Sequence, residues 1–133
     1  NAFGEELMIE NAEQAIDICC KKHNCCVNEF IVAPRFLKSG GGLHEWIIEF
    51  KSQPNSIKNF SHDLDETIRN LNSDYDAKRA NNLILSNLQV IVAKDDLFYL
   101  WLASHSKLGG QHKVPRLDNS RNTFLDILKL NQR

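Results

Sequence analysis

The sequence predicts an α+β fold, a two-layer domain in which helices cover one face of a small, mainly antiparallel or mixed sheet of three to four strands. Apolar and polar residues alternate over residues 43–50, which is typical of a strand. Apolar residues recur at steps of three and four over residues 57–71, which is typical of an amphipathic helix. The 133 residues can bury one sizeable core, and no linker divides them, so we expect a single domain over residues 1–133.

The first third of the chain predicts a helix followed by a hairpin. Residues 3–9 could form a short strand, after which Asn11 is placed to cap a helix over residues 12–23. Residues 27–36 are rich in β-branched and aromatic side chains and predict a strand. Pro34 marks either an edge or the end of pairing, because proline donates no ladder hydrogen bond. The glycine-rich residues 39–42 then predict the turn to an antiparallel partner.

That partner is the strand over residues 43–50, on which Glu45 and Glu49 share the less apolar face. They lie too far apart to share a proton, so we expect them to face solvent or basic residues, and we expect His44 to be structural. After the helix over residues 57–71, the pattern predicts further elements in this order: a short helix or turn over 72–79, a strand over 88–93, a helix capped by Asp95 or Asp96, and a last helix after residues 118–119.

Charge and hydrophobicity exclude two classes of partner. The net charge is −1 with acidic and basic residues interspersed, so no basic surface predicts nucleic-acid binding. No apolar run approaches the length of a membrane span, and no signal peptide is recognisable. We therefore expect a cytoplasmic protein without a membrane partner.

Four cysteines cluster within residues 19–26. Cys19 and Cys20 fall at the helical spacing of the buried face of the helix over residues 12–23, which favours a role as small core residues. Adjacent cysteines diverge on a helix and match zinc-ligand spacing poorly, so we expect no metal site here. A thiol or metal module remains a third alternative for the function of the chain.

The segment over residues 107–117, KLGGQHKVPRL, is the strongest candidate for a functional loop. Two glycines free the backbone, Pro115 stiffens it again, and Gln111, His112 and Lys113 between them can each meet an anion. A lysine on such a loop can deliver charge to a phosphate or carboxylate and withdraw it later. A solvated basic loop would show the same composition.

The stretches 43–50 (LHEWIIEF), 71–79 (LNSDYDAKR), 88–92 (LQVIV) and 111–116 (QHKVPR) occur in an order that resembles one known family. Residues 111–116 are similar to Gln-Tyr-Lys-(Thr/Val/Ala)-Pro-Arg near the C-terminus of the auxin-responsive Gretchen Hagen family of acyl-acid amido synthetases. The resemblance covers most of the chain. His112 replaces the plant tyrosine and Leu117 the plant cysteine, which indicates a bacterial-type member.

The resemblance implies that the chain, which begins at Asn1 rather than Met, is the mobile C-terminal domain of a longer adenylate-forming enzyme. The implied partners are a large N-terminal adenylating domain, a carboxylic acid, an amine or amino acid, and ATP with Mg²⁺. By resemblance Lys113 is the catalytic residue, and Gln111, His112 and Arg116 contact the nucleotide. We expect the full-length parent to be an enzyme and the isolated domain to be inactive and free of cofactor.

Two alternatives stay open at this stage. The parent could transfer the acyl group to a thiol instead of an amine, or the chain could be a free-standing binding module without catalysis. Arg116 could equally form an anchoring salt bridge inside the domain. Glu5 and Glu6 fit either the family's hinge or a solvated acidic turn.

Overall fold

The computed structural model describes residues 2–106 and 113–133. Along the chain its elements are α1 (Ile9–His23), β1 (Cys26–Phe36), β2 (Gly42–Ser52), α2 (Ile57–Leu71), α3 (Ser73–Arg79), the 3₁₀ helix η1 (Ala80–Asn82), β3 (Gln89–Val92), α4 (Leu97–Ser106) and α5 (Asn122–Asn131). The predicted α+β class, with a small mixed sheet covered by helices, is confirmed.

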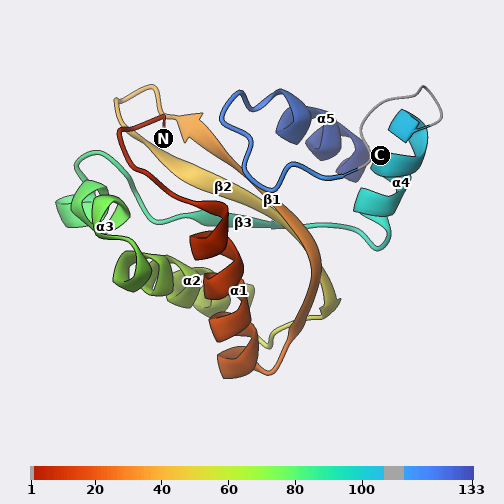
Figure 1. Ribbon diagram of the computed structural model, residues 1–133, viewed down its shortest axis with the longest axis horizontal. Helices are drawn as coiled ribbons and strands as arrows, with labels where there is room; N and C mark the ends of the chain where they lie inside the picture. Colours follow the sequence, from red (N-terminus) through yellow and green to blue (C-terminus); the bar gives the residue numbers. More distant parts are fainter. Residues whose placement is uncertain (1, 107–112) are drawn as a thin grey trace.

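The sheet has the strand order β1-β2-β3 (Figure 1). β1 and β2 form the predicted antiparallel hairpin, in which Val32 lies opposite Trp46, and β3 runs parallel to β2. A Cβ atom on Gly42 would lie only 2.3 Å from the backbone oxygen of Arg35, so the start of β2 requires glycine. Pro34 lies in β1 at the edge of this sheet, as predicted.

Helices cover both faces of the sheet because side chains alternate along β1 and β2. One face packs against α1 and α2, and its strand residues are Phe30, Val32, Trp46, Ile48 and Phe50. The other face packs against α4 and α5, and its strand residues are Ile31, Ala33 and Ile47. The sequence predicted helices on one face only; the second layer of helices is visible beside the C-terminus in Figure 1.

The best-predicted helix, α2, begins as expected. Ser56 is its N-cap and accepts a hydrogen bond from the backbone N–H of Asn59 at 3.1 Å. Its apolar stripe, which includes Phe60, Leu64 and Ile68, is completely buried. The amphipathic pattern therefore determined both the length of α2 and the face that packs on the sheet.

The start of α1 differs from the prediction. The N-cap is Met8, and the helix begins at Ile9 rather than at residue 12. Asn11 lies inside the first turn, where its side chain accepts a hydrogen bond from the backbone N–H of Met8 at 3.1 Å. This hydrogen bond to the side-chain oxygen of Asn11 has the geometry of a capping box, in which the third helical residue bonds back to the N-cap. The helix is therefore longer than predicted by most of a turn.

Residues 2–8, which precede α1, form no strand. It lies against the domain through other contacts: Phe3 packs on Phe36 with ring centroids 4.7 Å apart, and the side-chain amide of Asn72 donates to the carbonyl oxygen of Glu6 at 2.7 Å. Glu5 has no exposed surface, so the solvated acidic turn that the sequence allowed is wrong for this residue.

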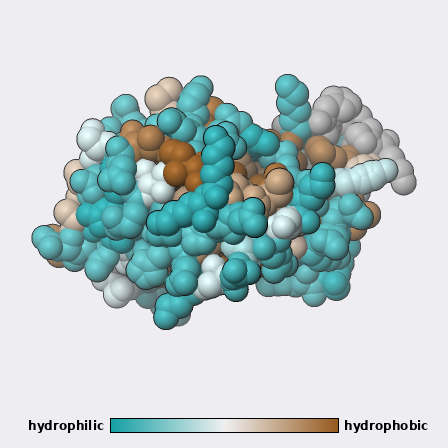
Figure 2. Space-filling model, turned by 90° about the horizontal axis from the view of Figure 1, so that it is seen from below, coloured by the Kyte–Doolittle hydropathy of each residue, from teal (hydrophilic) through white to brown (hydrophobic). Residues whose placement is uncertain are grey.

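The face shown in Figure 2 is mainly hydrophilic, with hydrophobic side chains scattered among the hydrophilic ones. Among the described residues, no helix is both long enough and apolar enough to cross a membrane.

Candidate functional site

The last residues of the predicted loop, 114–117, lie along the outer edge of β1 together with Asp118. The backbone N–H of Val32 donates to the carbonyl oxygen of Arg116, and the backbone N–H of Asp118 donates to the carbonyl oxygen of Val32, both at 2.8 Å. Val114 is buried among the side chains that α4 and α5 contribute. Residues 114–118 are thus attached to the sheet by backbone bonds and by packing.

Arg116 binds two carboxylates within the domain. Its guanidinium donates to Glu29 of β1 at 2.6 Å and to Glu13 of α1, and it lies 4.9 Å from the centroid of the Phe30 ring. Burial disfavours the charged form, but the two carboxylates outweigh that effect and raise the pKa of Arg116. The structure thus shows the anchoring salt bridge that the sequence left open, while contact with nucleotide stays a prediction.

Lys113 differs from Arg116 in its exposure and in its ion pairing. It is exposed, and it forms no ion pair with any residue in the described part of the chain. Gln111 and His112, the other two predicted contact residues, lie outside the described residues. Lys113 is therefore an exposed cation immediately before an anchored stretch of backbone.

Glu45 and Glu49 are both buried, which the prediction of solvent-facing carboxylates did not anticipate. Glu45 has the basic partners that were the other expectation: Arg121 contacts it at 2.6 Å and Arg35 at 3.2 Å. Glu49 instead accepts hydrogen bonds from the backbone N–H groups of Asp96 and Phe98, at 3.3 and 3.4 Å, where α4 begins. Arg121 thereby ties the start of α5 to β2, and Glu49 holds the start of α4 to the same strand.

An open depression of about 520 Å³ lies between α4, α5 and Pro115. At its wall Asp126 accepts a hydrogen bond from the indole N–H of Trp101 at 2.9 Å and lies 3.3 Å from His105. The rings of Trp101 and His105 stack with centroids 4.3 Å apart. Its described lining includes two carboxylates, Asp118 and Asp126, and no lysine or arginine, so this lining is ill suited to a phosphate.

The four clustered cysteines are free thiols that differ in burial. Cys19 is fully buried, as predicted, whereas Cys20 is half-buried. Burial raises the pKa of the Cys20 thiol to about 12, so it stays protonated and weakly nucleophilic near neutral pH. Among the described residues, no three His, Cys, Asp or Glu side chains come together in a way that could hold a metal ion.

Two buried polar groups were not predicted as such. Nε2 of His44 lies 2.6 Å from the carboxylate of Glu5. Asp65, completely buried in α2, accepts from the Tyr75 hydroxyl at 2.6 Å and pairs with Arg79 at 2.8 Å. The partners are 39 residues apart in the first group and 10 to 14 apart in the second, so no local motif marks them.

The geometry defines a class: a small α+β domain with a three-stranded mixed sheet that presents an exposed lysine before an anchored edge segment. The family model described as GH3 family C-terminal domain matches residues 10–122. The chain belongs to the GH3 family, as its C-terminal domain.

Two solved structures share the fold. One, described as the AtGH3.15 acyl acid amido synthetase in complex with 2,4-DB, has a TM-score of 0.72 and 19% identity over 96% of this chain and 25% of its own length. Another, GH3.15 acyl acid amido synthetase, has a TM-score of 0.67 and 17% identity over 92% of this chain and 21% of its own. The chain therefore spans about a quarter or less of the structures it matches. No curated protein matches it.

Proposed function

We propose that this chain is the C-terminal domain of an ATP-dependent acyl-acid amido synthetase and that it brings Lys113 to the reaction when it closes on the rest of the enzyme. The match to the GH3 C-terminal domain over residues 10–122 carries the proposal. The names of the two similar structures, both acyl acid amido synthetases, supply the activity that we transfer to the parent.

The proposed reaction has two steps. A carboxylate attacks the α-phosphorus of ATP and releases pyrophosphate, which leaves an acyl-adenylate; an amine then attacks the acyl carbon and releases AMP. Negative charge builds up on the α-phosphate in the first step. A lysine that arrives with the closing domain stabilises this charge and helps to exclude water, which would hydrolyse the mixed anhydride.

The contacts around Lys113 suit this role. Its side chain is exposed and is paired with no described carboxylate, so its charge can meet an anion on another surface. The backbone that follows it is fixed to β1 through Arg116 and Asp118, so the position of the lysine is set by the sheet. Arg116 supports this geometry through its bonds to Glu29 and Glu13 rather than as a free cation.

The decisive experiment is Lys113→Ala in the full-length parent, measured as acid-dependent exchange of pyrophosphate into ATP. We expect the exchange rate to fall by roughly two or more orders of magnitude, the scale of losing one electrostatic stabiliser. Lys113→Arg keeps the charge and should retain more activity. Lys129→Ala is the matched control, because Lys129 is an exposed lysine on α5, and it should exchange at the parental rate.

Unchanged exchange in Lys113→Ala would remove the assignment of the lysine. Product analysis with an amine and a thiol as competing acceptors decides between amide and thioester synthesis. A reading frame without an adenylating domain upstream would favour the free-standing binding module. Bacterial-type membership, cytoplasmic location and the contacts of Gln111 and His112 with nucleotide stay predictions from the sequence.

A further inference from the structure

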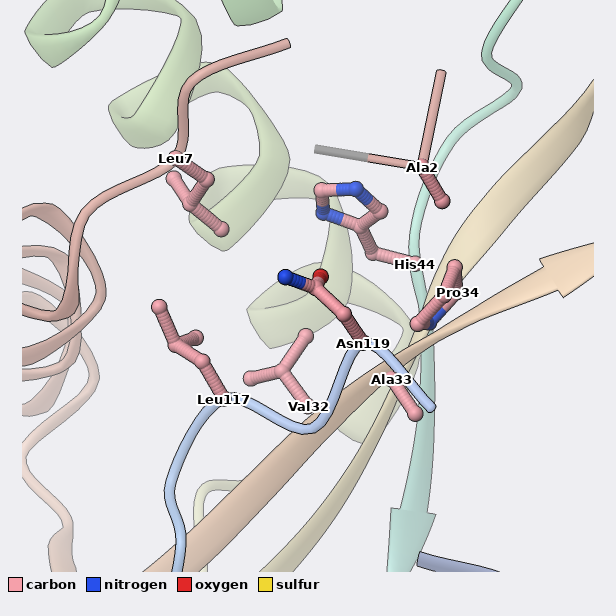
Figure 3. A pocket seen from close by; sticks show the side chains of 8 residues that line it. All are labelled: Ala2, Leu7, Val32, Ala33, Pro34, His44, Leu117 and Asn119. Atoms are coloured by element: carbon pink, nitrogen blue, oxygen red, sulfur yellow. The ribbon is translucent and has the colours of Figure 1, made fainter. Parts of the chain in front are cut away.

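A small cavity lies where three segments of the chain meet: the N-terminal segment, the hairpin of β1 and β2, and the stretch that follows Arg116. Its volume is about 30 Å³. Most of its wall is apolar, and the lining residues are Ala2, Leu7, Val32, Ala33, Pro34, His44, Leu117 and Asn119 (Figure 3).

The imidazole of His44 is the buried polar group in this wall. The side chain is 7% exposed, and its Nε2 is occupied by the carboxylate of Glu5 at 2.6 Å. Its Nδ1 is buried and has no hydrogen-bond partner among residues 2–106 and 113–133. Figure 3 shows a ring nitrogen of His44 directed toward the space between Leu7 and Asn119. Buried polar atoms in folded proteins are almost always satisfied, so a partner for Nδ1 is expected in this cavity.

We propose that an internal water molecule occupies this cavity and hydrogen-bonds Nδ1 of His44. A cavity of about 30 Å³ holds one or two water molecules and nothing much larger. Water donates to Nδ1 when the imidazole is neutral and accepts from it when the imidazole is charged, so it satisfies the atom in both states. An ion would be poorly solvated against the apolar walls formed by Leu7, Val32 and Leu117.

The site has a structural consequence that is independent of the enzymatic proposal. Glu5 and Leu7 belong to the N-terminal segment, His44 to β2, and Asn119, at the rim of the cavity, to the segment after Arg116. A water bonded to His44 lies between the buried Glu5–His44 pair and residues 117–119, which follow Arg116. It therefore helps to hold the two non-strand segments against the sheet.

A high-resolution crystal structure of this chain tests the proposal directly. We expect density for a water at about 2.7–3.2 Å from Nδ1 of His44. The double variant Glu5→Leu/His44→Phe replaces the pair by apolar groups and should leave the cavity dry. An empty cavity in the unsubstituted chain, or a protein group bonded to Nδ1, would overturn the proposal.

Val32→Ile gives a thermodynamic test, because the extra methyl group enters the cavity. In the unsubstituted chain it displaces the water and leaves Nδ1 unpaired, so we expect Tm to fall. In the Glu5→Leu/His44→Phe background the same methyl fills an apolar void, so we expect Tm to rise. The same sign in both backgrounds would contradict a water bonded to His44; if the double variant does not fold, the crystal structure of the unsubstituted chain decides.

Discussion

Glu5 illustrates how one residue can link stability to pH. Burial opposes its ionisation, but hydrogen bonds from His44 and from the backbone N–H of Phe3, together with the attraction of His44, lower its pKa to about 2 from 4.5. A depressed pKa in the folded state stabilises the fold above the unfolded-state pKa and ceases to do so as pH falls through the folded-state value. The contribution is at most roughly 3 kcal/mol.

We therefore expect the free energy of unfolding to decline between pH 4.5 and about 2, and to decline less in Glu5→Gln. Urea denaturation of both proteins across this range measures the difference. Their stability difference should be largest above pH 4.5 and should shrink toward the acid end. A difference that stays constant with pH would show that the Glu5 carboxylate is not ionised against His44.

Substitution of Arg116 should lower the free energy of unfolding more than substitution of Lys113. Arg116→Ala removes two ion pairs and a contact with the Phe30 ring, so we expect a loss of about 1–2 kcal/mol. Lys113→Ala removes an exposed side chain without a carboxylate partner and should change stability by less than about 0.5 kcal/mol. Urea denaturation of the two variants gives both values. Equal losses would mean that Lys113 also has a structural partner.

At the scale of elements, the buried Asp65 joins α2 to α3 and to the chain that leads into β3. Its carboxylate accepts from Tyr75 and Arg79 of α3 and, at 3.4 Å, from the backbone N–H of Leu88. Arg79 also donates to the carbonyl oxygen of Leu85. Burial raises the pKa of Tyr75, with the Asp65 charge acting in the same direction, so the hydroxyl keeps its proton and remains a donor.

Arg79→Met should be severe, because it leaves the buried charge of Asp65 without its counterion. We expect a loss of about 3–5 kcal/mol and faster hydrogen exchange in α3 and the chain before β3. Arg69→Met is the matched control: Arg69 pairs with Asp76 at 2.6 Å but near the surface, so the loss should stay below about 1 kcal/mol. Losses of similar size would contradict a dominant role for burial.

The elements that the sequence predicts well are those whose pattern and burial agree. The period of α2 and the alternation in β2 both match the faces that become buried. The turn between β1 and β2 requires the glycines at residues 40–42, which the sequence shows directly. The start of α1 was predicted too late because asparagine is a common N-cap residue. In the structure Asn11 is instead the third residue of the helix, and its side chain accepts the hydrogen bond from the backbone N–H of Met8. A side chain's capacity to cap does not determine its place in the turn.

The second layer of helices and the buried carboxylates could not be predicted locally. In the strand pattern Glu45 and Glu49 look exposed to solvent. The groups that pair with them when buried are far away in sequence: Arg121 is 76 residues from Glu45, and Asp96, at the start of α4, is 47 residues from Glu49. The parallel pairing of β3 with β2 depends in the same way on distant segments. Lys113 and Arg116 were identified from their motif, but only the contacts with Glu29 and Glu13 distinguish an anchor from an exposed cation.

At the scale of the whole molecule, the cavities seen among the described residues are poorly suited to a nucleotide. The cavity beside His44 has a volume of about 30 Å³, whereas small-molecule sites typically enclose about 300–1,000 Å³. Two larger depressions are open: one carries Asp118 and Asp126, and the other carries Asp17 beside Lys21. The two carboxylates of the first would repel a triphosphate, and in the second the charge of Lys21 is offset by Asp17, so neither supplies much affinity for a nucleotide.

We therefore expect this chain alone to show no ATP binding at micromolar concentration when it is titrated with ATP and Mg²⁺ in a calorimeter. The full-length parent should bind under the same conditions, since on our proposal the nucleotide pocket belongs to the remaining three quarters of the relatives' length. Lys113→Ala in the parent should weaken nucleotide binding less than it slows pyrophosphate exchange, because the lysine acts mainly on charge that develops in the transition state. Micromolar binding by the isolated chain, abolished by Lys113→Ala, would instead place a complete nucleotide site within these 133 residues.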